Sequence, residues 1–226
     1  MHKLLLRDII NKKEVTKLKD IPVFTTDNGV ASLVLKEIPI RNVAYIKILS
    51  SATPKLLLDE CTDFCKACGA ERILFSGIES DEYELAAVIV QMQASDLRES
   101  DALLFPATEE TIAYWREIYN KRMADVPNAA WMTKADEKKL LVDADCYFVH
   151  KNGELIGIGK ASGDEVETVV SVVRGSGERV LLALASVLDS NVVKLNVAIE
   201  NVRAVRLYER LGFTRIREVS RWYKYF

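Results

Sequence analysis

Residues 196–213 read NVAIENVRAVRLYERLGF, and this stretch decides the fold. We expect a strand over 192–199 that runs through a short turn into an amphipathic helix over 202–211. Asn201 stands where a helix N-terminus favours an Asn side chain, and Gly212 follows the last turn, where helices commonly end. The stretch therefore predicts a strand, a capped helix and the start of a closing strand.

A glycine-rich turn lies one helix and one strand upstream, where residues 174–179 read RGSGER. It joins a predicted strand over 166–173 to a predicted helix over 177–188. Gly175 and Gly177 permit positive φ and close approach of a ligand to the backbone. The first turn of a helix adds free N–H groups and about half a positive charge. The turn predicts a pyrophosphate site, although a plain strand-to-helix turn explains the same residues.

Together the two stretches resemble the GNAT superfamily of N-acetyltransferases, in which the helix motif ENxRAxxLYExLGF follows the coenzyme loop after one helix and one strand. Two motifs in this order are more specific than either alone. The resemblance covers residues 101–226. It implies an α/β fold with a mixed sheet, the GNAT-like acyl-CoA N-acyltransferase fold, with acetyl-CoA as co-substrate and no metal.

The resemblance also implies which residues hold the coenzyme. The backbone from Arg174 to Val180 would wrap the pyrophosphate, Asn201 would hydrogen-bond the pantetheine, and a main-chain N–H near Val169 or Val170 would polarise the thioester carbonyl. The expected cofactor-binding residues are Val169, Val170, Arg174, Gly175, Ser176, Gly177, Glu178, Arg179 and Asn201.

Tyr208 matches the family tyrosine near the thioester sulfur. A phenol with a reference pKa near 10 is protonated at neutral pH and can donate to a departing thiolate, so Tyr208 is the expected general acid. A core tyrosine is the alternative. Family members often use a Glu on the strand before the loop as base, and we expect Glu165 and Glu167 to share one face of that strand with Val169. Solvated strand-end carboxylates are the alternative for both.

Two residues depart from the family pattern. Arg179 occupies a position where a small residue is expected, so its side chain would either reach the phosphate or obstruct it. Ser171 occupies a position where a Pro commonly precedes the loop. These departures, with the uncertain base, motivate a second hypothesis: a catalytically inactive protein that binds or senses acyl-CoA.

The first hundred residues show a similar order of elements: strand, strand, helix, strand and, over Ser80–Gln93, a second helix. Residues 50–54, SSATP, replace the glycine-rich loop. We therefore expect residues 1–98 to be a degenerate GNAT-like unit without a cofactor site and residues 101–226 to be the catalytic domain, in a tandem arrangement. An unrelated small α/β domain is the alternative for the first part.

Three cysteines suggest a remote third hypothesis. Cys61, Cys65 and Cys68 have the CxxxCxxC spacing with which radical SAM enzymes bind an iron–sulfur cluster. The same cysteines continue the apolar stripe of a predicted helix over 54–68, where a free Cys behaves as a small hydrophobic residue. Buried thiols are the preferred interpretation.

Composition excludes several other classes. With 31 basic and 33 acidic side chains the net charge is -2, and no block of Lys or Arg marks a nucleic-acid surface. No apolar run approaches the roughly 18 residues that cross a bilayer, and the N-terminus lacks the apolar region of a signal peptide. We expect a cytoplasmic enzyme, monomer or homodimer, that acetylates a primary amine of a small molecule or peptide by direct attack in a ternary complex.

Overall fold

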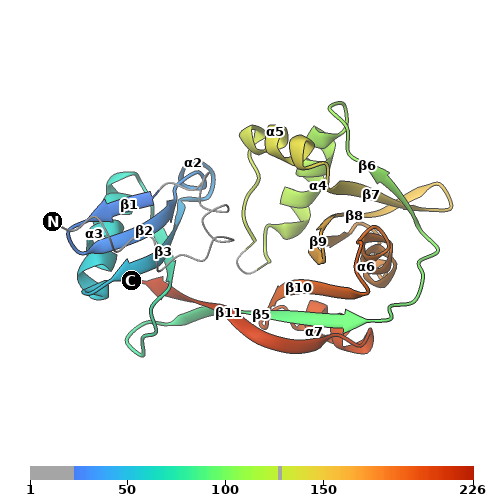
Figure 1. Ribbon diagram of the computed structural model, residues 1–226. Helices are drawn as coiled ribbons and strands as arrows, with labels where there is room; N and C mark the ends of the chain where they lie inside the picture. Colours follow the sequence, from blue (N-terminus) through green and yellow to red (C-terminus); the bar gives the residue numbers. More distant parts are fainter. Residues whose placement is uncertain (1–22, 127–128) are drawn as a thin grey trace. The chain divides into compact units, whose positions relative to one another are not determined.

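The computed structural model describes residues 23–126 and 129–226, which form two compact units (Figure 1). Unit 1 comprises the chain up to Ala86 together with Arg221–Phe226, and unit 2 comprises Ala87–Ser220. The division therefore lies earlier than the predicted linker near residue 98, and the end of the chain returns to unit 1. The assignment of residues 1–98 as a degenerate GNAT-like unit and of residues 101–226 as the catalytic domain stays a prediction.

Unit 1 is a mixed sheet with the strand order β1-β2-β3-β4-β11, in which β3 and β4 are parallel and the other neighbours are antiparallel. The connection between the parallel strands is α3, which begins at Pro54, a residue suited to a first helical turn. The elements are β1 (Val23–Thr26), β2 (Gly29–Val34), α2 (Ile38–Arg41), β3 (Val43–Ser51), α3 (Pro54–Ala67), β4 (Arg72–Ser76) and the end of β11 (Thr214–Tyr225).

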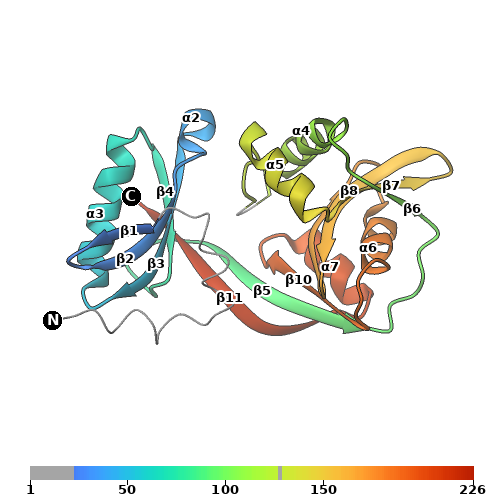
Figure 2. The same ribbon diagram turned by 45° about the horizontal axis from the view of Figure 1, so that its top comes forward.

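Unit 2 is built on the strand order β5-β10-β9-β8-β7-β6, in which only β9 and β10 are parallel. Helices α6 and α7 pack on one face, and α4 and α5 pack on the other (Figure 2). The elements are β5 (Leu85–Ser95), β6 (Leu103–Pro106), α4 (Ile112–Met123), α5 (Lys134–Asp143), β7 (Cys146–Lys151), β8 (Glu154–Ser162), β9 (Glu165–Ser171), α6 (Gly177–Ala185), β10 (Val192–Ala198), α7 (Val202–Arg210) and most of β11. Every element predicted between residues 103 and 225 is present, and the mixed α/β fold class is confirmed.

One predicted helix, Ser80–Gln93, is wrong. Residues 85–95 form β5, and along it Val88, Val90, Met92 and Ala94 are buried at every second position. The acidic residues before this segment resemble a helical first turn, but the period-two pattern of apolar residues outweighs them. Residues 80–93 therefore do not form the second helix of the expected internal copy, and the tandem arrangement stays a prediction.

Two glycines bring α6 close to the sheet. Gly157 and Gly159 lie on the α6 face of β8, and a Cβ atom at either position would overlap the side chain of Val180 or Leu184, respectively. Glycine permits this approach because it carries no side chain. The packing fixes the position of α6 and hence of the glycine-rich turn that precedes it.

Replacing Gly159 tests this packing. We expect Gly159→Val to lower the free energy of unfolding by about 1–3 kcal/mol or more, because the new side chain occupies the space of Leu184. Urea denaturation followed by circular dichroism measures the change. Ser162→Ala, at the exposed end of the same strand, is the control and should change stability by less than about 0.5 kcal/mol. Equal midpoints for both variants would contradict the described contact.

Candidate active site

Strands β9 and β10 separate after a single paired position. Within the described part of the chain, the only ladder pair between them is Glu165 with Lys194. On its other edge β9 pairs with β8, and β10 pairs with β5 from Val192 to Ala198. The two facing edges therefore carry backbone groups without ladder partners, and such groups need a partner from solvent or a ligand.

A cleft of about 940 Å³ opens along these facing edges, entirely within unit 2. Its walls come from β9, β10, the glycine-rich turn, α7 and the end of α4. Four arginines line it, whereas only two carboxylates do, Glu167 and Glu178. The lining arginines are Arg122, Arg174, Arg203 and Arg210. The balance of charge favours an anionic ligand.

A β-bulge interrupts β9 at Glu167. Val166 pairs with Ala161 and Thr168 pairs with Lys160, so Glu167 is an extra residue opposite no partner. The side-chain alternation changes there: Val166 and Val169 contact the core under α6, whereas Val170 contacts the core under α4. The expectation that Glu165, Glu167 and Val169 share one face is therefore wrong.

The glycine-rich turn is held open by Gly175 and Ser176. Gly175 has φ +88°, a backbone conformation that glycine adopts without strain. The buried Ser176 hydroxyl donates to the carbonyl oxygens of Ile156 and Val173 at 2.7 and 2.8 Å, so this side chain supports the turn and does not face the cleft. The first-turn N–H groups of α6, at Gly177, Glu178 and Arg179, have no partner within the helix.

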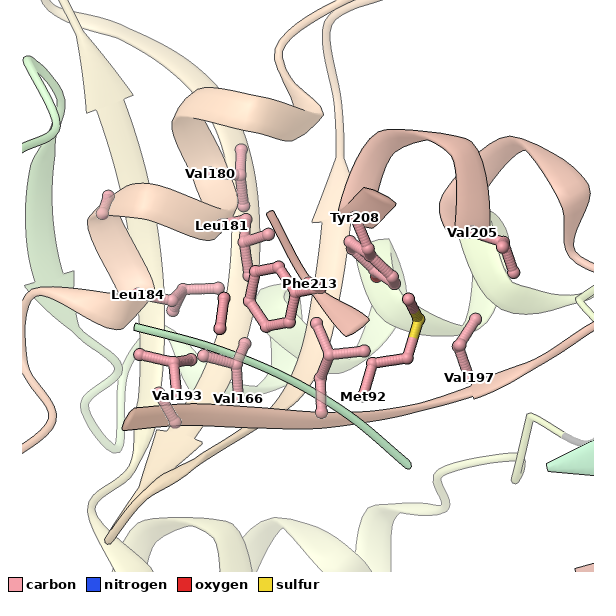
Figure 3. Close-up of a cluster of buried hydrophobic side chains, with 14 of the residues drawn as sticks. Met92, Val166, Val180, Leu181, Leu184, Val193, Val197, Val205, Tyr208 and Phe213 are labelled. Carbon is pink, nitrogen blue, oxygen red and sulfur yellow. The ribbon is translucent and has the colours of Figure 1, made fainter. Parts of the chain in front are cut away.

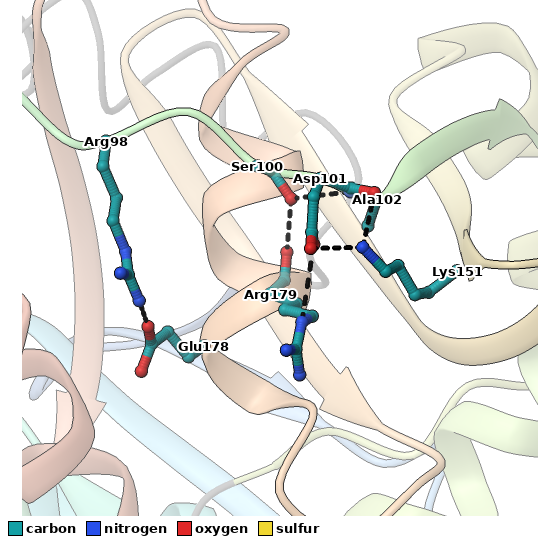
Figure 4. A network of polar contacts seen from close by, with 7 residues as sticks. All are labelled: Arg98, Ser100, Asp101, Ala102, Lys151, Glu178 and Arg179. Atoms are coloured by element: carbon teal, nitrogen blue, oxygen red, sulfur yellow. Dashed lines mark hydrogen bonds and ion pairs between the residues drawn. The ribbon is translucent and has the colours of Figure 1, made fainter.

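The Arg179 side chain points away from the cleft. Its Nε lies 3.4 Å from Asp101 Oδ1, Lys151 pairs with the same carboxylate, and the Arg179 carbonyl accepts a hydrogen bond from Ser100 (Figure 4). Glu178, which does line the cleft, is paired with Arg98. Arg179 therefore neither reaches nor obstructs the cleft, whereas Arg174 lines it.

Asn201 and the α7 motif lie at the wall opposite β9. The Asn201 side chain accepts a hydrogen bond from the Ala204 N–H at 3.3 Å, which makes it the N-cap of α7, and it also lines the cleft. The predicted cap is confirmed, and its role toward pantetheine stays a prediction.

Tyr208 belongs to the core and to the cleft. Its side chain lies beside Phe213 in the buried cluster (Figure 3), and the two ring centroids are 5.9 Å apart. Tyr208 is 8% exposed and contributes to the cleft wall. Burial raises the pKa of Tyr208 to about 12. The phenol is therefore protonated at neutral pH, the state that proton donation requires.

The two candidate bases are in different surroundings. Glu165 accepts a hydrogen bond from Asn196 Nδ2 at 2.5 Å and is not part of the cleft wall. Glu167 lines the cleft and accepts a hydrogen bond from Lys160 Nζ at 2.8 Å. Of the pair, Glu167 is the carboxylate that a bound substrate can reach.

Several cleft residues escape prediction from the sequence. Arg203 and Arg210 stand seven residues apart on α7, and this helical spacing would have placed them on one face. Arg122, on α4, donates to the Val172 carbonyl at 2.7 Å, a contact between segments fifty residues apart that no local pattern reveals. Lys160, which contacts the cleft residue Glu167 and does not itself line the cleft, also escapes prediction because it lies within a mostly apolar strand.

The three cysteines lie in unit 1, where Cys61 and Cys65 are packed in the core and Cys68, at the C-cap of α3, is exposed. The prediction of buried thiols is confirmed for Cys61 and Cys65 and is wrong for Cys68. Cys61 and Cys65 are fully buried, and burial raises the pKa of Cys61 to about 11 and of Cys65 to about 12. Metal ligation needs thiolates, which these surroundings disfavour. Among the described residues, no group of three or more His, Cys, Asp or Glu is placed to hold a metal ion. Likewise, none of the described helices combines the length and the apolar character needed to cross a membrane.

Comparisons with known proteins agree with the fold. No protein-family model and no curated protein match the chain. Among solved structures, a GCN5-related N-acetyltransferase from Kribbella flavida has a TM-score of 0.58 at 10% identity, covering 89% of this chain and 58% of its own. A GCN5-related N-acetyltransferase from Sphaerobacter thermophilus has a TM-score of 0.52 at 11% identity, covering 87% of this chain and 76% of its own.

A third similar structure aligns with this chain over nearly the full length of both proteins. It is a functionally unknown conserved protein from Staphylococcus epidermidis, with a TM-score of 0.55 at 13% identity, covering 95% of this chain and 96% of its own. The two acetyltransferases show that this chain has the mixed α/β fold of the GNAT-family N-acetyltransferases. The fold predicted from the two sequence motifs is confirmed.

Two arginines five positions apart, Arg174 and Arg179, test the orientation of the turn. We expect Arg174→Ala to weaken the binding of coenzyme A by about 3- to 10-fold, because a charge-assisted contact to phosphate is lost. Arg179→Ala should leave the affinity unchanged, since that side chain pairs with Asp101. Isothermal titration calorimetry measures both. The opposite pattern would mean that phosphate approaches α6 from the side of Asp101.

Proposed function

We propose that this protein is an N-acetyltransferase that transfers the acetyl group of acetyl-CoA to a primary amine. The observation that carries the proposal is the cleft between β9 and β10. Backbone edges without ladder partners, the glycine-rich turn with Arg174, and a buried, protonated Tyr208 meet there. The fold of known acetyltransferases supports the same conclusion.

The coenzyme would bind along the free edge of β9. The turn N–H groups and Arg174 suit a diphosphate. The unpaired backbone groups after the bulge suit the amides of pantetheine, which can pair with a strand edge as a peptide does. The chemistry that acetyl-CoA supplies is a thioester, an activated acyl group that an amine can attack directly.

The chain's own residues would move the two protons of the reaction. Glu167 would accept a proton from the attacking amine, Tyr208 would donate one to the departing thiolate, and a main-chain N–H near Val169 or Val170 would stabilise the oxyanion. A carbon–nitrogen bond forms as the carbon–sulfur bond breaks, in a complex that holds both substrates. The acceptor is proposed to be an amine of a small molecule or peptide.

One observation favours a second candidate, a protein that binds acyl-CoA without turnover. Glu167, the candidate base, is already held in an ion pair with Lys160, so one of its carboxylate oxygens is occupied before an amine arrives. The two candidates separate in one experiment. Saturable binding of acetyl-CoA with release of free coenzyme A on a panel of amines supports the enzyme, and saturable binding without release supports the sensor.

Substitution of Gly177 tests the proposed coenzyme site. A Cβ atom here would lie 3.0 Å from Ser171 Oγ and 3.1 Å from Leu207 Cδ2, so the branches of Val would crowd the cleft. We expect Gly177→Val to weaken coenzyme A binding at least about 10-fold in calorimetry. Circular dichroism verifies folding. Unchanged affinity in a folded variant would place the pyrophosphate elsewhere, and absence of binding by the unaltered protein would overturn the proposed function.

Removal of one hydroxyl tests the proposed acid. Tyr208→Phe should lower turnover by about 10- to 100-fold, because the thiolate leaves without a proton donor, while packing against Phe213 and affinity for acetyl-CoA persist. Thiol release under saturating substrates measures turnover. The matched control is Tyr114→Phe, an exposed tyrosine of α4 outside the cleft. Equal turnover of the two variants would remove Tyr208 from the mechanism.

A further inference from the structure

Three charged residues from neighbouring segments meet at the bulge of β9. Lys160 Nζ lies 2.8 Å from Glu167 Oε2 and 3.1 Å from Asp145 Oδ2. The side chains of Lys160 and Asp145 are 15% and 8% exposed, whereas that of Glu167 is 42% exposed and lines the cleft. Asp145 directly precedes β7. Because the exposed fraction rises from Asp145 through Lys160 to Glu167, the three groups form a row from the protein interior to the cleft.

Lys160 remains charged in this row. Burial by itself lowers the pKa of Lys160, but the hydrogen bonds and charges of Glu167 and Asp145 outweigh burial and raise that pKa above its ordinary value. Burial raises the pKa of Asp145, and Lys160 opposes that rise. Cys146 and Asp143 are the other titratable groups whose charges couple to the row. A buried ammonium between two carboxyl groups is costly unless both contacts are kept.

The bulge gives Lys160 a specific task. In a regular strand the alternation of side chains fixes the direction of each one, but a bulged residue lies outside the ladder. Glu167 is that residue, and its side chain accepts a hydrogen bond from the ammonium group of Lys160 on the adjacent strand. The direction of the Glu167 carboxylate is therefore set by Lys160.

We propose that Lys160 is a positioning residue that holds the Glu167 carboxylate at the cleft face of the β9 bulge and acts on the reaction only through Glu167. This inference rests on the proposed acetyltransferase function. Asp145 compensates the positive charge of Lys160 on the side opposite Glu167.

The test is a double-mutant cycle. We expect Lys160→Met to lower kcat by about 10- to 100-fold, as for a misplaced catalytic group, with little change in acetyl-CoA affinity. In the Glu167→Gln background, Lys160→Met should cause no further loss, and Lys160→Arg should restore part of kcat in the unaltered background. Additive losses, or unaltered turnover in Glu167→Gln, would overturn the proposal.

A matched control comes from an ion pair on the same sheet. Lys194 Nζ lies 2.5 Å from Asp164 Oδ2 and neither residue lines the cleft. Lys194→Met removes an ammonium group from the neighbouring strand without touching Glu167, so kcat should be unchanged. A loss equal to that of Lys160→Met would attribute the effect to general charge and overturn the specific role of Lys160.

A double variant keeps the test valid if Lys160→Met alone does not fold. Lys160→Met alone leaves Asp145 buried without its cation, whereas Asp145→Asn combined with Lys160→Met removes both buried charges, which proteins tolerate better. Its crystal structure should show Glu167 in several rotamers where the unaltered protein shows one, and a single unchanged rotamer would overturn the proposal. This readout does not require turnover. If the unaltered protein transfers no acetyl group, the proposed function is refuted, but the crystal structure of the double variant still decides whether Lys160 positions Glu167.

Discussion

The separation of β9 from β10 is the constraint on which the rest of unit 2 depends. Each strand is anchored by its other neighbour, β8 or β5, so neither can move to close the gap. Parallel strands normally satisfy each other's backbone groups along their length. Here one pair is formed and the following groups are left to a ligand or water. The cleft thus lies where backbone pairing between β9 and β10 stops, and side chains of both strands, the glycine-rich turn and α7 line it.

The glycine-rich turn and Tyr208, which lie beside this gap, are held in place by contacts with the protein core. Gly157 and Gly159 allow α6 to approach the sheet, which places the glycine-rich turn at the end of β9. Ser176, buried below the turn, ties it back to the end of β9 and to β8. Tyr208 is part of the same core as Val180 and Leu184. The geometry that a reacting group would meet is therefore determined by close packing, which resists small displacements.

The sequence predicts the fold of unit 2 well because its signals are local. The capped α7 motif and the turn of residues 174–179 each lie in one continuous segment, and both are found as expected. The orientation of Glu167 could not be predicted in this way. A bulge is a mismatch in the pairing of two strands, so the sequence of one strand does not reveal it. Arg179 illustrates the same limit: its neighbour Asp101 is distant in sequence, and only the folded chain brings them together.

Unit 1 and β5 show where local reasoning fails. Acidic residues before Leu85 imitate the start of a helix, yet pairing of β5 with β10 gives the segment its conformation. Propensity is a weak guide when a neighbouring strand supplies the partners. The internal copy suggested by the order of elements rested partly on that helix, so the likeness of the two halves is smaller in the structure than in the sequence.

The strand pairings of the two units also bear on how the chain is made. Strand β4 has β3 on one edge and residues Tyr223–Tyr225 on the other, although nearly all of unit 2 lies between them in sequence. During synthesis from the N-terminus, β4 is therefore an uncovered edge until the ribosome has released residues 221–226, and uncovered edges invite association with other chains. The sheet of unit 1 therefore cannot be completed until a segment that is synthesised after unit 2 has paired with β4.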